Sequence, residues 1–169
     1  MSGRVTLLLG GARSGKSKRA LDLAQTPPLT FLATAEAFDD EMRARIDAHK
    51  EERRNLGWAL IEDPLDLAAA LQNHTEGCLV IDCLTLWLNN LIFYERNVET
   101  EVSRLTEHLP AGGDVILVSN EVGLAIAPEN ALARRFRDLQ GQLNQQVARV
   151  ADRVELLVAG LPVVVKDDA

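Results

Sequence analysis

An α/β fold with a mostly parallel sheet between two layers of helices is predicted by two observations. Short apolar runs alternate with longer segments of helical period, which is typical of successive strand–helix units. The 169 residues, of which 47% are hydrophobic, fit one domain spanning residues 1–169 with a sizeable core. Strands are expected at residues 5–9, 29–34, 58–61, 79–82, 115–119, 154–158 and 163–166, the last two forming a C-terminal β-hairpin. Helices are expected at residues 17–24, 39–53, 65–71, 84–94, 98–109 and 131–151.

The first apolar run leads directly into a complete Walker A phosphate loop. Its glycines permit a tight turn, so that backbone N–H groups and the next helix N-terminus point at phosphate oxygens. Lys16 would reach the β- and γ-phosphates, and Ser17 would offer a hydroxyl to Mg²⁺, the expected cofactor. The motif predicts a nucleotide-binding protein with the three-layer P-loop NTPase (RecA-like) fold. Its residues are Gly10, Gly11, Ala12, Arg13, Ser14, Gly15, Lys16 and Ser17.

Polar residues end several predicted strands, where ligands bind in such sheets. Asp82 has the position of a Walker B carboxylate that would hold Mg²⁺, although a helix-capping role is the alternative. Thr34 and Glu62 end two other strands, and Asn120-Glu121 follow the fifth. For each of these residues, satisfying turn amides is an equal alternative. Glu121 is a hypothetical base for an attacking hydroxyl.

His49 is the more discriminating residue, because a phosphate-loop kinase needs no histidine nucleophile. Met42, Ile46 and His49 are spaced to share one helix face, so the histidine is expected to face inward or into a cleft. From spacing alone, a satisfied buried histidine is favoured over a catalytic one.

Composition excludes several other classes. A formal charge of −7 without a basic stripe argues against a nucleic-acid partner. Cys78 and Cys83 lack metal-ligand spacing and are expected to pack as small apolar residues. No apolar stretch would span a bilayer and no signal segment is evident, so a cytoplasmic location is expected. The pair Arg53-Arg54 fits a solvated helix face or a phosphate contact equally well. The aromatic residues Trp87, Phe93 and Tyr94 are expected in the core rather than as a platform for a macrocycle.

An ordered set of motifs covers essentially the whole chain and resembles the bifunctional adenosylcobinamide kinase/adenosylcobinamide-phosphate guanylyltransferase family of cobalamin biosynthesis. The phosphate loop alone would identify only a superfamily, and the full set is far more specific. After Gly10 to Ser17, the set comprises Phe31-Leu32-Ala33-Thr34-Ala35, Asp39-Asp40-Glu41-Met42, Arg45-Ile46-Asp47-Ala48-His49-Lys50, Asp82 to Asn90, Val118 to Gly123, Pro128-Glu129-Asn130, Arg135 to Asp138, and Gly141 with Asn144-Gln145.

The resemblance implies two activities. The first is phosphorylation of the aminopropanol hydroxyl of adenosylcobinamide by ATP or GTP. The second is transfer of GMP from GTP, through a guanylylated His49, to give adenosylcobinamide-GDP. It implies that His49 and Lys16 are catalytic and that the protein is a homotrimer. By motif matching, further nucleotide contacts are Thr34, Ala35, Glu36, Lys50, Glu51, Glu52, Arg53, Glu62 and Asp82. Glu62 could accept hydrogen bonds from guanine N1–H and N2–H, and Lys50 and Arg53 could neutralise phosphates.

Two alternatives remain open from the residues themselves. A simple small-molecule kinase would use the phosphate loop and leave His49 structural. A nucleotide-gated interaction protein would switch shape with the γ-phosphate, but neither an Asp-x-x-Gly nor an Asn-Lys-x-Asp motif is present to support it.

Overall fold

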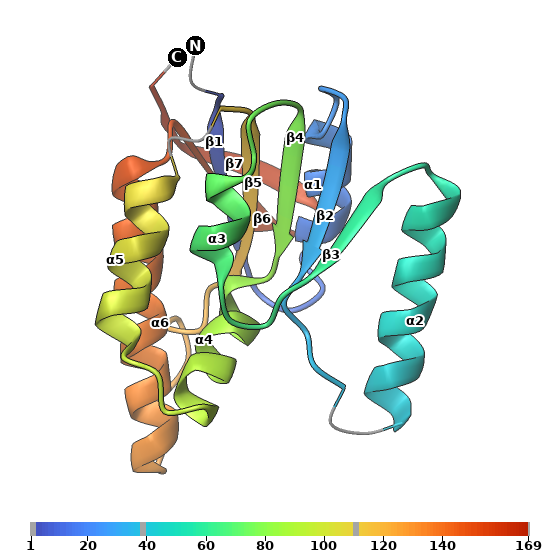
Figure 1. Ribbon diagram of the computed structural model, residues 1–169. Helices are drawn as coiled ribbons and strands as arrows, with labels where there is room; N and C mark the ends of the chain where they lie inside the picture. Colours follow the sequence, from blue (N-terminus) through green and yellow to red (C-terminus); the bar gives the residue numbers. More distant parts are fainter. Residues whose placement is uncertain (1–2, 38–39, 110–111, 169) are drawn as a thin grey trace.

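Seven strands form one sheet in the order β3-β2-β4-β5-β1-β6-β7, as the computed structural model shows in Figure 1. The description covers residues 3–37, 40–109 and 112–168, without the side chains of Arg45, His49 and Glu52. In this order, neighbouring strands from β3 through β2, β4, β5 and β1 to β6 pair in parallel. Strand β7 pairs antiparallel with β6. The strands are β1 (Val5–Gly10), β2 (Leu29–Ala33), β3 (Ala59–Glu62), β4 (Cys78–Asp82), β5 (Asp114–Asn120), β6 (Arg153–Val158) and β7 (Leu161–Asp167). The helices are α1 (Lys16–Leu23), α2 (Asp40–Asn55), α3 (Leu67–Gln72), α4 (Leu84–Phe93), α5 (Val98–His108) and α6 (Ala131–Val150).

The predicted elements and the C-terminal hairpin are confirmed, with shifts of one or two residues at most ends. The predicted first residue of α2, Asp39, lies outside the described residues. The hairpin begins its second strand at Leu161, earlier than predicted, because Ala159 and Gly160 alone form the turn with φ angles of 51° and 80°.

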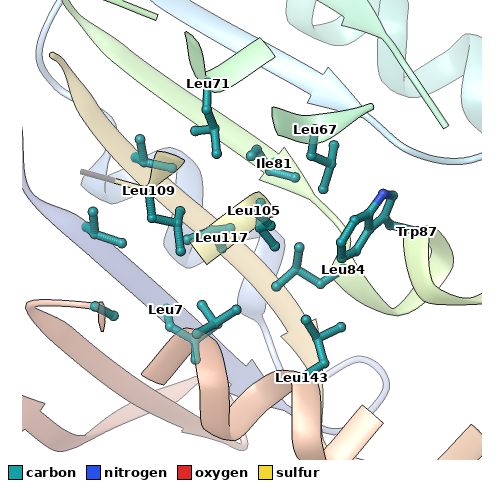
Figure 2. Close-up of a cluster of buried hydrophobic side chains, with 14 of the residues drawn as sticks. Leu7, Leu67, Leu71, Ile81, Leu84, Trp87, Leu105, Leu109, Leu117 and Leu143 are labelled. Carbon is teal, nitrogen blue, oxygen red and sulfur yellow. The ribbon is translucent and has the colours of Figure 1, made fainter. Parts of the chain in front are cut away.

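Apolar side chains fill both faces of the sheet, as expected where helices cover each side. Helices α3 to α6 cover one face, where Leu7, Leu117 and Leu143 belong to the larger buried cluster (Figure 2). Helix α1 covers the other face, where Ala20 packs with Leu8 and Val118. Helix α2 stands beyond the edge strand β3 (Figure 1).

Among the aromatic residues, only part of the prediction holds. Trp87 is buried in the larger cluster, and its indole N–H donates to the Leu65 carbonyl oxygen at 2.8 Å. The prediction that Phe93 and Tyr94 also pack in the core is wrong, because 64% and 44% of their surfaces are exposed. They lie at the end of α4, which runs on beyond the sheet (Figure 1). Both cysteines are buried and free, as predicted, and burial raises the pKa of the Cys78 thiol to about 12.

None of the helices within the described residues has the length and apolar character needed to cross a bilayer.

A buried carboxylate ties the helix after the phosphate loop to the C-terminal hairpin. Glu155 of β6 is fully buried and accepts hydrogen bonds from Arg19 of α1 at 2.8 Å and from Arg153 at 2.8 Å. Asp167 of β7 accepts from Arg153 and from Arg4. The hydrogen bond from Arg19 lowers the pKa of Glu155, so the ionised carboxylate stabilises the folded state.

Replacing Glu155 with Gln is therefore expected to lower the free energy of unfolding at pH 7 by about 2 kcal/mol, since it removes charge-assisted hydrogen bonds from a buried site. Because the folded-state pKa is depressed, this contribution is present above the ordinary pKa of a glutamate and is lost as pH falls through the folded-state value. Chemical denaturation of both proteins at neutral and acidic pH measures the difference. Glu107→Gln, at an exposed position of α5, is the control. An unchanged difference across this acidic range would contradict the assignment.

Candidate active site

The phosphate loop connects β1 to α1 and is shaped by two glycines and the C-terminal hairpin. A Cβ at Gly10 would lie 2.5 Å from Ser14 Oγ and 2.8 Å from the Leu157 carbonyl oxygen, so a larger residue would displace the loop. Gly15 precedes α1 with a φ of 99°, in the left-handed region that favours glycine. The Gly160 N–H donates to the Ser14 carbonyl oxygen at 2.9 Å, which joins the loop to the hairpin turn.

Lys16 lies nearly buried across its own loop. Its Nζ donates to the Gly11 carbonyl oxygen at 2.6 Å and lies 3.4 Å from Ser14 Oγ. Burial lowers the pKa of Lys16, while electrostatic interactions with Cys83 and Asp82 oppose the shift. A hollow of about 270 Å³ above the loop is lined by Arg13, Ser14, Gly15, Lys16, Ser17 and Lys18. The loop therefore has space for phosphate groups beside a partly desolvated ammonium group.

Ser17 and Asp82 meet at the carboxyl edge of the sheet. Ser17 Oγ donates to Asp82 Oδ2 at 2.9 Å, which brings together two oxygen groups from distant segments. No group of three or more His, Cys, Asp or Glu side chains that could hold a metal ion occurs within the described residues. One carboxylate and one hydroxyl nevertheless suit Mg²⁺, which usually takes its remaining ligands from water and substrate phosphates.

Thr34, which follows β2, is hydrogen-bonded to the backbone of Asp82 and Cys83. Its hydroxyl donates to the Cys83 carbonyl oxygen at 2.7 Å and accepts from the Cys83 N–H at 2.9 Å. The Thr34 N–H donates to the Asp82 carbonyl oxygen at 3.2 Å, and Asn90 Nδ2 donates to the Thr34 carbonyl oxygen at 2.8 Å. Thr34 is fully buried, so its side chain positions the Asp82 turn. Direct contact of Thr34 with a nucleotide stays a prediction.

A cavity of about 290 Å³ opens from Ser17 and Asp82 toward α2. Its walls are mainly apolar. Strands β2, β3 and β4 meet there through the sheet register, in which Ala33 pairs with both Glu62 and Asp82, and helices α1, α2 and α4 supply further lining residues. The remaining lining residues are Phe31, Ala35, Met42, Ile46, Lys50, Arg53, Leu60, Ile61 and Leu86.

The charged residues of α2 enter this cavity in two ways. Arg53 is buried, and its guanidinium lies 3.8 Å from the centre of the Phe31 ring, a cation–π contact. Lys50 forms an ion pair with Glu62 of β3 across the cavity. The sequence left open whether Arg53-Arg54 lie on a solvated helix face or contact phosphate. Arg54 is exposed, as expected for a solvated helix face, whereas Arg53 is buried.

Other predicted contacts fall outside the cavity lining. Glu36 accepts hydrogen bonds from the Tyr94 hydroxyl at 3.1 and 3.2 Å. Glu51 is exposed and lies 3.8 Å from Arg54. Glu121 Oε1 accepts from the Gly123 N–H at 2.7 Å, so its carboxylate folds onto its own loop. The side chains of His49 and Glu52 lie outside the described residues, although Met42 and Ile46, predicted to share the face of His49, line the cavity.

The sequence analysis did not identify four residues that contribute to the site. Phe31 contacts the Arg53 guanidinium, Leu60 lines the cavity, Asn90 donates to the Thr34 carbonyl oxygen, and Tyr94 donates to Glu36. Only Asn90 carried a signal, since it is an amide residue within the mainly apolar α4, and it proves to be buried. A buried carboxamide needs partners, and those of Asn90 are the Thr34 and Pro64 carbonyl oxygens.

Comparison with known sequences agrees with the phosphate-loop geometry. Residues 6–165 match the CobU family, described as "Cobinamide kinase / cobinamide phosphate guanyltransferase". The bifunctional adenosylcobalamin biosynthesis protein CobP of Pseudomonas aeruginosa is 45% identical, with 96% of this chain and 97% of the relative aligned. The corresponding CobU proteins of Salmonella typhimurium and Escherichia coli are 38% and 35% identical, each over 95% of this chain and 98% of the relative.

Comparison of structures supports the fold alone. The flagellar accessory protein FlaH of Methanocaldococcus jannaschii superposes with a TM-score of 0.56 at 13% identity, covering 99% of this chain and 80% of that protein. The predicted P-loop NTPase fold is confirmed by this neighbour together with the sheet and hairpin.

Thr34→Val is expected to lower the free energy of unfolding of the nucleotide-free protein by about 1–3 kcal/mol, because it leaves the buried N–H and carbonyl oxygen of Cys83 without their hydroxyl partner. Chemical denaturation without nucleotide is the measurement. Thr30→Val on the same strand is the control, since no hydrogen bond of the Thr30 hydroxyl occurs among the described residues. Equal stability of Thr34→Val and wild type would exclude the positioning role.

Proposed function

Because the chain belongs to the cobinamide kinase / cobinamide phosphate guanyltransferase family and is an enzyme of that bifunctional class, we propose the following two-step reaction for it. It phosphorylates adenosylcobinamide with ATP or GTP. It then transfers GMP from GTP, through guanylyl-His49, to the new phosphate and gives adenosylcobinamide-GDP. Both steps belong to the biosynthesis of cobalamin.

The observation that carries this proposal is the continuity between the phosphate loop and the cavity beneath α2. Ser17 and Asp82 line the same cavity as Met42, Ile46 and Lys50 of the helix that contains His49. A nucleoside triphosphate whose outer phosphates bind the loop would extend its base along this helix. The α-phosphate would then lie between the loop and the base, on the side of α2.

In the kinase step, the hydroxyl oxygen of the substrate would attack the γ-phosphorus and the bond to the β–γ bridging oxygen would break. Lys16 and the backbone N–H groups of the loop would hold the β- and γ-phosphates in line with the acceptor. We propose that Ser17 and Asp82 would hold Mg²⁺, which would supply positive charge to offset the negative charge of the phosphates.

In the guanylyl step, a neutral ring nitrogen of His49 would attack the α-phosphorus of GTP and release pyrophosphate. The phosphate of the corrinoid substrate would then attack the same phosphorus and free the histidine. Two displacements replace one difficult reaction between anions. An imidazole suits this task because its neutral form is well populated near pH 7.

The cavity supports recognition of a guanine base by Glu62. A carboxylate can accept hydrogen bonds from both N1–H and N2–H of guanine, and Glu62 lies on the cavity wall opposite α2. Lys50 now pairs with this carboxylate, so base binding would redirect the ammonium group toward a phosphate. The apolar walls around Phe31 and Leu60 would exclude water from the base.

The remaining nucleotide contacts are proposals on the same basis, and so are a homotrimer and a cytoplasmic location. Subunits that share a site would help so small a chain to bind a large corrinoid. A stable monomer with full activity would exclude that explanation.

Treating the protein with Mg²⁺ and GTP is expected to give an acid-labile GMP adduct on the wild type and none on His49→Ala, because the variant lacks the imidazole nitrogen that forms the phosphoramidate. Intact-protein mass spectrometry before and after acid measures the adduct. His108→Ala is the matched control, since that ring binds Gln72 and the Arg104 carbonyl oxygen away from the cavity. An adduct that survives in His49→Ala would contradict the proposed intermediate. A wild-type protein that binds GTP but gives no adduct, and forms no adenosylcobinamide-GDP when corrinoid phosphate is supplied, would favour a simple kinase.

Asp82→Asn is expected to weaken the effect of Mg²⁺ on GTP binding by about tenfold, because the amide is a poor magnesium ligand. Without metal, the variant should bind GTP at least as tightly as wild type, since a carboxylate repels phosphate. Titration of GTP with Mg²⁺ and with a chelator gives the ratio of the two dissociation constants. Asp22→Asn, an exposed residue of α1, is the control. An unchanged ratio in Asp82→Asn would remove Asp82 from the metal site.

A further inference from the structure

Strand β5 separates the phosphate-loop strand β1 from the Asp82 strand β4, and its last residue is Asn120. In the sheet register, Asn120 pairs with Gly10, where the phosphate loop begins, and Val118 pairs with Asp82. Asn120 is thus the side chain at the carboxyl edge between the two segments expected to hold phosphate and metal.

Alternation along β5 decides which face of the sheet Asn120 occupies. Ile116 and Val118 belong to the cluster under α1, whereas Leu117 belongs to the opposite cluster and Ser119 bonds to α6. Asn120 therefore lies on the α1 face. This is also the face on which Asp82 contacts Ser17.

A buried polar network holds the backbone of Asn120 in place. Its N–H donates to Thr85 Oγ1 at 2.9 Å, and its carbonyl oxygen accepts from Asn144 Nδ2 at 3.1 Å. Behind it, Ser119 Oγ donates to Asn144 Oδ1 at 2.7 Å, and Gln140 Nε2 bonds to both. Burying polar side chains costs free energy unless they form hydrogen bonds. Here polar side chains occupy core positions that apolar side chains could fill, and their hydrogen bonds hold the end of β5 in place.

The Asn120 carboxamide itself is available. Across the residues that the structure describes, no hydrogen bond to this carboxamide occurs, and the residue is half-buried at the edge of the sheet. A carboxamide provides two N–H donors without a charge. With a base in the cavity beneath α2, the nucleotide passes Asp82 before it reaches β5, so the phosphate nearest Asn120 is the terminal one.

We propose that Asn120 is a catalytic residue of the kinase step and donates a hydrogen bond to the terminal phosphoryl group during its transfer. This inference rests on the proposed function. In that step the acceptor oxygen bonds to the γ-phosphorus, the β–γ bridging oxygen leaves with the nucleoside diphosphate, and the hydroxyl proton passes to water. A donor aimed at an equatorial oxygen stabilises the charge of the transition state. In the guanylyl step the reacting phosphorus is the α-phosphorus, so the same donor contributes little.

The test uses GTP for both reactions under single-turnover conditions. Transfer of label from γ-labelled GTP to adenosylcobinamide measures the kinase step, and transfer from α-labelled GTP to His49 measures the guanylyl step. For Asn120→Ala, the first rate is expected to fall by about 100-fold, and the second to change by less than about fivefold. Asn120→Asp, which keeps the shape but loses the donors, should be at least as slow in the kinase step. The KM for GTP and the Tm should stay close to wild type, and Asn73→Ala, at the far end of α3, is the control.

Three results would overturn the proposal. Equal losses in both rates would show that Asn120 only supports the fold. An unchanged kinase rate in Asn120→Ala, with wild type active in both reactions, would remove its catalytic role and leave the proposed function intact. A wild-type protein that transfers neither label would refute the proposed function and this inference with it.

Discussion

The register of the parallel sheet is the constraint on which the site depends. Backbone hydrogen bonds align Glu62, Ala33 and Asp82 across three neighbouring strands, and they align Asn120 with Gly10. Side chains in a strand alternate between faces, so a shift of one residue in β4 would turn Asp82 away from Ser17. The two apolar clusters prevent such a shift, because each strand presents large buried side chains to both layers of helices. Packing of the core thereby fixes the position of the polar edge.

Buried polar side chains fix the backbone at the carboxyl edge of the sheet. Thr34 and Asn90 hold the turn after β4 from one side, while Asn144 holds the end of β5 from the other. Each of these groups forms several hydrogen bonds within the core, so its burial is compensated. The arrangement fixes the backbones of Asp82 and Asn120, with the Asp82 side chain in contact with Ser17 and the Asn120 side chain on the same face of the sheet. Preorganisation of this kind is what catalysis of phosphoryl transfer requires, since little covalent chemistry is left to the protein.

The helix that contains His49 is held differently. Helix α2 stands beyond the edge strand and meets the sheet through Lys50, which pairs with Glu62, and Arg53, which lies on Phe31. These are contacts of long side chains at the wall of a cavity, where a ligand can replace or compete with them. The phosphate loop, in contrast, is joined to the core by β1, α1 and the hairpin turn. The phosphate loop, joined to the core, thus lies next to a cavity whose charged residues can exchange partners.

The sequence by itself determined the order of elements, the phosphate loop, the carboxylate at the end of the fourth strand and the family, because each follows from neighbouring residues or a fixed helical period. It also indicated that Met42 and Ile46 share a face, which the cavity confirms. Only the tertiary structure decided that β5 lies between β1 and β4, that Arg53 is buried on Phe31, that Thr34 braces Cys83, and that Phe93 and Tyr94 are exposed. These features depend on packing and hydrogen bonds between segments far apart in the chain, and no local pattern specifies which distant segment a strand or side chain will meet.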